Sequence, residues 1–86
     1  MDFEYDPAKS ASNKLKHGID FNEAQLLWND LNRIEIPARI SDETRVVIIG
    51  KIQNKHWAAV ITYRERRIRI LSVRRARENE RDIYES

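Results

Sequence analysis

Apolar side chains change their spacing near residue 33 of this 86-residue chain. Before that point they recur at helical intervals, first at Ala8, Ala11 and Leu15 and then at Phe21, Ala24, Leu27, Trp28 and Leu31. After it, apolar and polar residues alternate or form short β-branched runs, which is typical of strands. Helices grouped ahead of consecutive, closely linked strands predict an α+β fold whose main sheet is antiparallel and four-stranded.

Both helical segments carry residues that favour helix ends. Asp6 is suited to cap the first helix, and Pro7 is tolerated at its first position. Gly18 is placed to end that helix in a left-handed conformation. Asp20 begins the second helix, and Glu23 three residues later completes an acidic variant of a capping box. Helix-breaking residues at 29–32 end the second helix.

The strands are expected at residues 3–5, 33–36, 44–52, 57–63 and 67–73. Pro37 is expected to halt the second of these, because proline has no N–H for the ladder. Turns are expected at residues 41–43 and 54–55. Residues 46–49 are apolar on both faces, which predicts an interior strand. Residues 76–84 carry apolar side chains at helical spacing and predict a short closing helix.

Length and composition exclude several classes of protein. The chain forms one domain, residues 1–86, without cysteines, and its two histidines lie too far apart to suggest a zinc site. Its longest apolar run is too short to cross a bilayer, and the acidic N-terminal segment lacks the apolar core of a signal peptide. There is no glycine-rich phosphate loop. We therefore expect a soluble cytoplasmic protein that contacts no membrane and uses no metal or cofactor.

Positive charge is concentrated in the last third of the chain. Residues 64–81 contain eight arginines and three glutamates, whereas residues 1–63 contain eight basic and nine acidic side chains. Guanidinium groups stay charged and match the geometry of phosphates, so this asymmetry indicates a polyanionic partner. The alternative is an ordinary solvated, charged face.

Alternation in the strand at 67–73 predicts which of its side chains face the same way. Arg67, Arg69, Leu71 and Val73 are expected on one face, with Ile68, Ile70 and Ser72 on the other. The first two arginines would then stand about 7 Å apart, near the spacing of successive phosphates in a single strand.

Arg74 and Arg75 follow at the junction of this strand with the closing helix. The free N–H groups of a helix start attract anions, so Arg74 is a candidate for holding a scissile phosphate. The alternative is a salt bridge from Arg74 or Arg75 to a nearby carboxylate such as Glu78.

Histidine is the natural proton-transfer residue at neutral pH, and His17 follows the cationic Lys16. A histidine at a helix C-terminus also simply favours the helix dipole, so both interpretations of His17 stay open. His56, in an expected hairpin turn, is interpreted as exposed and without a role. Trp57 is assigned to the core, with base stacking as the alternative. Tyr84 either donates its hydroxyl to a site or only packs.

Two groups of residues resemble the ends of a known family. They are Asp6-Pro7-x-Lys9-x-x-x-Asn13-x-x-Lys16-His17-Gly18-Ile19-x-Phe21-x-x-Ala24 and Arg69-Ile70-x-Ser72-x-Arg74-x-Ala76-x-x-x-Glu80-Arg81-x-x-Tyr84. In this order and separation they are similar to the BrnT toxins of bacterial type II toxin–antitoxin systems, and Arg45 and Gly50 match between them. The resemblance implies a RelE-like fold and a ribonuclease that stops translation. It also implies a BrnA-type antitoxin encoded beside the toxin, and a complex that binds operator DNA through the antitoxin.

A metal-free ribonuclease has to activate the ribose 2′-hydroxyl, stabilise the charge on the phosphorane and protonate the 5′-oxygen. We predict that Arg74, with Arg69 and Arg45 beside it, stabilises that charge. His17 is predicted as the general base or acid, with Glu80 or Tyr84 as alternatives. Further RNA contacts are expected from the cationic side chains of Lys9, Lys16, Arg67 and Arg75. The alternative function is a non-catalytic basic module that binds an acidic protein or nucleic acid.

Overall fold

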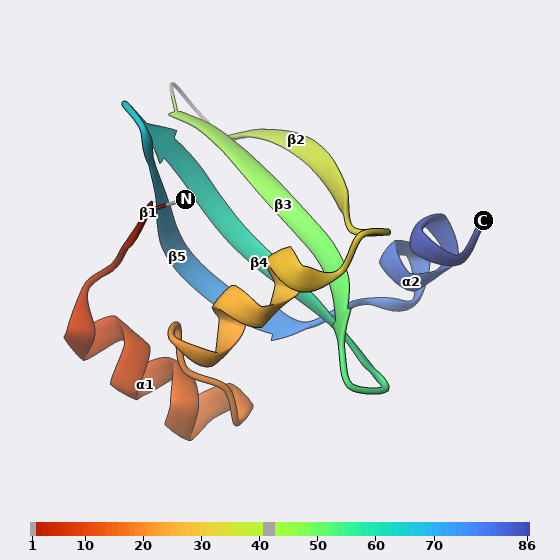
Figure 1. The fold of residues 1–86 in the computed structure, drawn as a ribbon, viewed down its shortest axis with the longest axis horizontal. Coiled ribbons are helices and arrows are strands. Elements are labelled where there is room, and N and C mark those ends of the chain that lie inside the picture. Colours follow the sequence, from red (N-terminus) through yellow and green to blue (C-terminus); the bar gives the residue numbers. More distant parts are fainter. Residues whose placement is uncertain (1, 41–42) are drawn as a thin grey trace.

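The computed structural model describes residues 2–40 and 43–86, and their arrangement is an α+β fold (Figure 1). The elements in chain order are β1 (Asp2–Glu4), α1 (Pro7–His17), the 3₁₀ helix η1 (Glu23–Asn29), β2 (Ile34–Ile40), β3 (Glu43–Ile52), β4 (Lys55–Arg64), β5 (Arg67–Arg75) and α2 (Glu78–Glu85). The helix α1 lies beside β5 and η1 lies next to β3, whereas α2 lies apart from both near the C-terminus (Figure 1). The predicted class and order of elements are therefore confirmed.

The sheet has five strands in the order β1-β5-β4-β3-β2. Four of them pair antiparallel, as expected, but β1 pairs parallel with β5, so the sheet is mixed. The prediction of a four-stranded sheet was wrong in this respect, because parallel pairing of a three-residue segment with a strand at the far end of the chain leaves no periodic signal. β3 lies between β4 and β2, so the interior position of residues 46–49 is confirmed.

The strand ends differ from the expected ones by a few residues. The β3–β4 turn lies at Gln53 and Asn54, one residue earlier than predicted, and Gln53 has a positive φ of 58°. Pro37 does not halt β2, which runs on to Ile40. Proline is tolerated there because β2 is the edge strand of the sheet. The turn predicted at residues 41–43 includes positions 41 and 42, which lie outside the described residues, and residue 43 already belongs to β3.

The ends of α1 are built as the sequence predicted. The Asp6 carboxylate accepts a hydrogen bond from the Ala8 N–H at 2.8 Å, with Pro7 at the start of the helix. Gly18 closes the helix with φ at 80° and donates its N–H to the Lys14 carbonyl. A residue with a side chain would be strained at that φ, which accounts for glycine at this position.

The apolar stripe predicted for α1 faces solvent rather than the sheet. Leu15 is 90% exposed, and Ala8 and Ala11 are exposed as well. The buried residues of α1 are instead polar, Ser10 and Asn13. Spacing alone could not predict this orientation, because Ser10 and Asn13 face inward to satisfy backbone groups rather than to bury apolar area.

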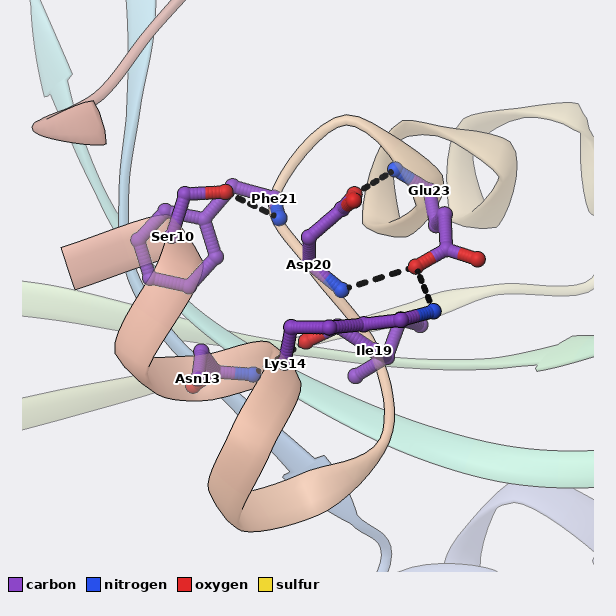
Figure 2. A network of polar contacts seen from close by, with 7 residues as sticks. All are labelled: Ser10, Asn13, Lys14, Ile19, Asp20, Phe21 and Glu23. Carbon is purple, nitrogen blue, oxygen red and sulfur yellow. Dashed lines mark hydrogen bonds and ion pairs between the residues drawn. The ribbon is translucent and has the colours of Figure 1, made fainter. Parts of the chain in front are cut away.

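The connection between α1 and η1 is held by a polar network (Figure 2). The Ser10 hydroxyl accepts a hydrogen bond from the Phe21 N–H at 2.9 Å. Asp20 and Glu23 exchange hydrogen bonds between side chain and backbone, as predicted for the capping box. Lys14 donates to the Glu23 carboxylate from the preceding helix at 2.7 Å. These contacts set the angle at which the chain leaves α1 and enters η1.

Asn13 completes the edge of β5 where β1 ends. Its amide donates to the carbonyls of Ile19 at 2.8 Å and Val73 at 2.9 Å, and its oxygen accepts from the Val73 N–H at 3.2 Å. β1 pairs with β5 as far as Arg69, so the later residues of β5 have no strand on that side. The Asn13 side chain therefore takes the place of a neighbouring strand at Val73.

The core lies between the helical layer and one face of the sheet. Its fully buried members include Phe21, Ala24 and Leu27 from the helical side and Ile48, Ile61 and Val73 from the strands. Trp57 is buried there, as predicted, and Trp28 is partly buried. Leu31 was expected to continue the apolar stripe but is 93% exposed, because η1 already ends at Asn29.

Gly50 lies where η1 packs tightly against the sheet. A Cβ at this position would lie 3.1 Å from Leu27 Cδ2 and 3.3 Å from the Asp30 carboxylate. Asp30 in turn accepts the Lys51 N–H at 2.8 Å, beyond the point where β2 stops pairing with β3. The absence of a side chain at Gly50 thus lets η1 and Asp30 reach the backbone of β3.

A bulge in β5 changes the predicted assignment of its faces. Ile61 pairs with Ile70 and Val60 pairs with Ser72, so the register skips Leu71. Val73 consequently joins Ile68 and Ile70 in the core, and Ser72 turns to the opposite face. The prediction that grouped Val73 with the arginines was wrong, since one extra residue reverses the alternation beyond it.

Candidate phosphate-binding face

The bulge gathers cationic side chains on the sheet face opposite α1 and η1. Register and alternation place Arg67, Arg69, Ser72 and Arg74 of β5 on this face, together with Arg45 of β3. We call it the arginine face. From Arg67 to Arg74 the strand covers about 23 Å, calculated from the rise per residue. Four of the ten predicted site residues therefore share one surface.

Arg74 is held by a two-point contact with Glu80. Its Nη1 and Nη2 donate to the two carboxylate oxygens of Glu80 at 2.7 and 3.0 Å, and Nη1 also reaches the Arg75 carbonyl at 3.4 Å. No described residue bonds to Nε, and 24% of the side chain is exposed. The edge of the guanidinium formed by Nη1 and Nη2 is thus fixed to Glu80, and an anion would have to bind along the edge that carries Nε. The salt bridge considered as the alternative is present, with Glu80 rather than Glu78.

Glu80 is organised to stay ionised. The hydrogen bonds from Arg74 hold the pKa of Glu80 below its ordinary value, against the effect of burial. Its Oε1 also accepts the Arg77 N–H at 2.8 Å, so the same carboxylate stabilises the first turn of α2. A carboxylate engaged in this way fixes the orientation of Arg74. This role of Glu80 differs from the proton transfer that was predicted for it from the sequence.

The other arginines of this face differ in how firmly they are held. Arg69 Nη1 donates to the Glu4 carboxylate of β1 at 3.0 Å, and both side chains are partly exposed. Arg67 is exposed close to the β4–β5 turn, beside Arg64, with which it pairs across the hairpin. The face therefore combines a fixed end at Arg74 with an exposed cationic end at the hairpin.

Arg75 lies on the other side of the sheet. It pairs with Trp57 across β4, and its guanidinium sits 5.4 Å from the centre of the Trp57 ring. Its Nε donates to the His56 carbonyl at 3.3 Å. Arg75 thus covers the core tryptophan, in a cation–π contact, and is not part of the arginine face.

A second group of basic side chains lies along the edge of β5. Lys9, Lys16 and His17 of α1 line a shallow cleft of about 210 Å³ together with Leu71 and Ser72. We call this the basic cleft. Ser72 belongs to both the cleft and the arginine face, so the two surfaces are contiguous. The structure therefore brings His17 next to the bulge, in a cleft whose lining residue Ser72 precedes Arg74 by two positions on β5.

Sequence reasoning missed a group of polar contacts between α2 and the end of the sheet. His56 Nε2 lies 2.6 Å from the Glu85 carboxylate, and the His56 ring meets the Tyr84 ring edge-on at 5.2 Å. Lys51, opposite His56 on β3, places its Nζ 3.6 Å from Glu85. We call these four residues the His56 cluster. His56 is thus neither idle nor free, although nothing in the sequence brings residues 56 and 85 together.

Tyr84 is committed to a hydrogen bond within the chain. Its hydroxyl donates to Asp30 Oδ2 at 2.6 Å, and this bond, with burial, raises the pKa of Tyr84 to about 12. Burial disfavours the charged form of Asp30, but hydrogen bonds from Tyr84 and the backbone outweigh it and hold the Asp30 pKa below its ordinary value. Tyr84 therefore anchors α2 to the residue that follows η1.

Within residues 2–40 and 43–86, no three histidine or acidic side chains come together in a way that would hold a metal ion. No helix in those ranges is long and apolar enough to span a membrane.

Comparison with protein families identifies one match. Residues 5–80 match the family model described as the ribonuclease toxin BrnT of a type II toxin–antitoxin system. This range contains the caps of α1, Asn13, Gly50, the arginine face and Glu80. Comparison with curated proteins finds no match. Because the family model covers most of the chain, the protein belongs to the BrnT family of ribonuclease toxins of type II toxin–antitoxin systems.

Proposed function

We propose that this protein is a metal-independent RNA endonuclease that acts in the cytoplasm and inhibits translation, with the arginine face as its RNA-binding surface. The observation that carries the proposal is the geometry of Arg74. Glu80 fixes its guanidinium in one orientation, and Nε makes no hydrogen bond with any described residue. A pre-oriented guanidinium stabilises developing charge without a cost of reorganisation during the reaction.

The length of the arginine face suits a short stretch of single-stranded RNA. The strand path from Arg67 to Arg74, about 23 Å by rise per residue, spans three to four phosphates at roughly 6–7 Å each. Arg69 lies within that path, and Arg45 approaches it from β3. Lys9 and Lys16 in the basic cleft, with His17 beside them, extend the cationic surface around the edge of β5.

The reaction that this surface supports is internal transesterification. The ribose 2′-oxygen bonds to phosphorus as the bond from phosphorus to the 5′-oxygen breaks, leaving a 2′,3′-cyclic phosphate and a 5′-hydroxyl end. Arg74 stabilises the negative charge of the phosphorane, while Arg69 and Arg45, farther along the arginine face, bind neighbouring phosphates. Loss of one such donor reduces the rate by roughly 10²–10³-fold at preorganised anion sites.

The toxin's partner is expected to be an antitoxin of the BrnA type encoded beside it. A segment that covers the arginine face would carry acidic side chains, because complementary charge favours both encounter and register. Toxin and antitoxin together would bind operator DNA through the antitoxin.

Induction in bacterial cells, followed by gel analysis of total RNA, tests the proposal. Wild-type protein is expected to arrest growth and fragment RNA, and Arg74→Ala is expected to do neither. Arg74→Lys keeps the positive charge but loses the planar guanidinium, which can bond to Glu80 along one edge and to a phosphate along another. A large loss of RNA cleavage by folded Arg74→Lys would therefore identify orientation, rather than charge, as the property that matters. Arg81→Ala, on exposed α2, is the control for loss of one positive charge.

Arrest by folded Arg74→Ala would contradict the assignment of Arg74. Harmless expression of soluble wild-type protein, with intact RNA, would instead favour the non-catalytic binding module.

A further inference from the structure

We infer that His56, oriented by Glu85, is the general base that removes the proton from the ribose 2′-hydroxyl. This inference rests on the proposed ribonuclease function and adds to it a catalytic residue that the sequence did not single out. It concerns the end of the arginine face where α2 packs against β3 and where Arg74 is held.

His56 and Arg74 share a face of the sheet. Ala58 is the partner of Arg74 across the β4–β5 ladder, and His56 lies two residues before Ala58 on β4. Side chains two residues apart on a strand point to the same face, which is opposite to that of the buried Trp57. Diagonal neighbours of this kind lie about 7–8 Å apart, within reach of long side chains. A phosphate on the Nε edge of Arg74 would therefore lie close to the His56 ring.

The His56 ring is fixed in a way that suits a base. Nε2 is held by the Glu85 carboxylate at 2.6 Å, while Nδ1 makes no hydrogen bond with any described residue. The side chain is only 15% exposed, so its surroundings restrict its movement. A carboxylate on one ring nitrogen stabilises the imidazolium that forms when the other nitrogen accepts a proton. The Tyr84 ring, anchored by Asp30, packs edge-on against the imidazole.

The other histidine lacks these features. His17 is the last residue of α1, and its ring makes no hydrogen bond or ion pair within the described parts of the chain. It lines the basic cleft with Lys9 and Lys16, which suits contact with a phosphate. Nothing there orients the ring as Glu85 orients that of His56.

The protons and bonds of the step balance as follows. His56 Nδ1 takes the 2′ proton as the 2′-oxygen bonds to phosphorus, and the departing 5′-oxygen takes a proton from water. The imidazolium then returns its proton to the hydroxide left in solution, so the protein is unchanged at the end. The charged and titratable groups around His56 come from three elements, namely Lys51 of β3, Arg74 and Arg75 of β5, and Tyr84 and Glu85 of α2.

Cleavage of total RNA and of a mixed-sequence single-stranded RNA oligonucleotide by purified protein, measured against pH, tests this assignment. Wild-type cleavage is expected to fall in acid with an inflection, because a protonated imidazole cannot accept the 2′ proton. His56→Gln is expected to lose roughly 10²–10⁴-fold in cleavage rate and to lose that inflection, since general bases contribute this much. Added imidazole is expected to restore part of the rate in His56→Ala, because free imidazole can occupy the vacated space.

Two further variants separate catalysis from the anchoring of α2. Asp30→Asn weakens the bond that holds Tyr84 but leaves His56 and Glu85 in place, so it is expected to lower the melting temperature and to keep the pH inflection. Glu85→Gln is expected to lower the rate, because the imidazolium that forms in the reaction loses its carboxylate partner.

Retention of the wild-type rate and inflection by His56→Gln would overturn the assignment of His56, and would leave His17 as the candidate base. A loss of rate in His56→Ala that imidazole cannot restore, matched by an equal loss in Asp30→Asn, would show that His56 only anchors α2. Absence of cleavage by wild-type protein would instead contradict the proposed function itself.

Discussion

Asn13 offers a sharp test of how this small domain is stabilised. It is one of two polar residues that α1 buries, and its side chain joins three backbone groups of Ile19 and Val73. Replacement by alanine would remove all three hydrogen bonds at once. The two groups on Val73 would be left unpaired at a stretch of β5 that has no neighbouring strand on that side.

The expected loss of stability follows from the number of hydrogen bonds removed. Each hydrogen bond contributes a net 0.5 to 1.5 kcal/mol, so three of them amount to about 3 kcal/mol. Domains of this size have total stabilities of roughly 5 to 15 kcal/mol, and each kcal/mol shifts the melting temperature by about 4 to 8 °C. Asn13→Ala is therefore expected to melt roughly 12 to 24 °C below the wild type.

Urea denaturation followed by tryptophan fluorescence and by circular dichroism measures this free energy. Ser12→Ala is the matched control, because Ser12 is the exposed neighbour of Asn13 on the same helix. Its change is expected to stay within about 0.5 kcal/mol. A loss below about 1 kcal/mol in Asn13→Ala, within the range of a single hydrogen bond, would refute the view that this side chain replaces a strand.

Three other changes test the core, the exposed helix and the pair at Arg74. Gly50→Ala is expected to lower the free energy of unfolding in urea by about 1 to 3 kcal/mol, because the added Cβ would clash with Leu27. Leu15→Ser is expected to change the free energy of unfolding by less than about 0.5 kcal/mol. Leu27→Ala is expected to lower it by about 2 to 5 kcal/mol. An equal loss from both changes would contradict the orientation of α1. Glu80 has a depressed pKa in the fold. Its stabilisation is therefore present above its unfolded value of about 4.3 and lost as pH falls through the folded value. The difference in unfolding free energy between wild type and Glu80→Gln should accordingly shrink in acid, and a difference independent of pH would contradict the pairing with Arg74.

The site was predictable in part. Arginine concentration and the family resemblance were sufficient to single out Arg74, Arg69, Arg67 and Arg45, which the structure places on one face. Arg75 was not separable from them, because its direction depends on the phase of the strand after the bulge at Leu71. A bulge leaves no trace in the spacing of a run such as residues 67–75, in which arginine and isoleucine alternate from the start.

His56 shows a different limit of predicting a site from sequence. Its interest comes from a contact with Glu85, twenty-nine positions later, and from its diagonal relation to Arg74 across a strand pair. Neither relation is local in the sequence, so neither can be read from a motif or a period.

Local signals in this chain determined the features that depend on neighbouring residues. Asp6, Pro7 and Gly18 define the ends of α1, the reciprocal bonds of Asp20 and Glu23 lead into η1, and alternation locates four strands. Each of these depends on backbone conformation or hydrogen bonding within a few residues, which composition and spacing report directly.

Tertiary structure alone decided the features that depend on backbone N–H and C=O groups without a partner in the sheet. β1 ends at Glu4 and leaves the edge of β5 unpaired, so Asn13 turns inward and Leu15 turns outward, against the apolar spacing of α1. Leaving a buried backbone group without a hydrogen bond lowers stability more than exposing one leucine does. Which of the two occurs can be decided only when the distant segments that contact α1 are known.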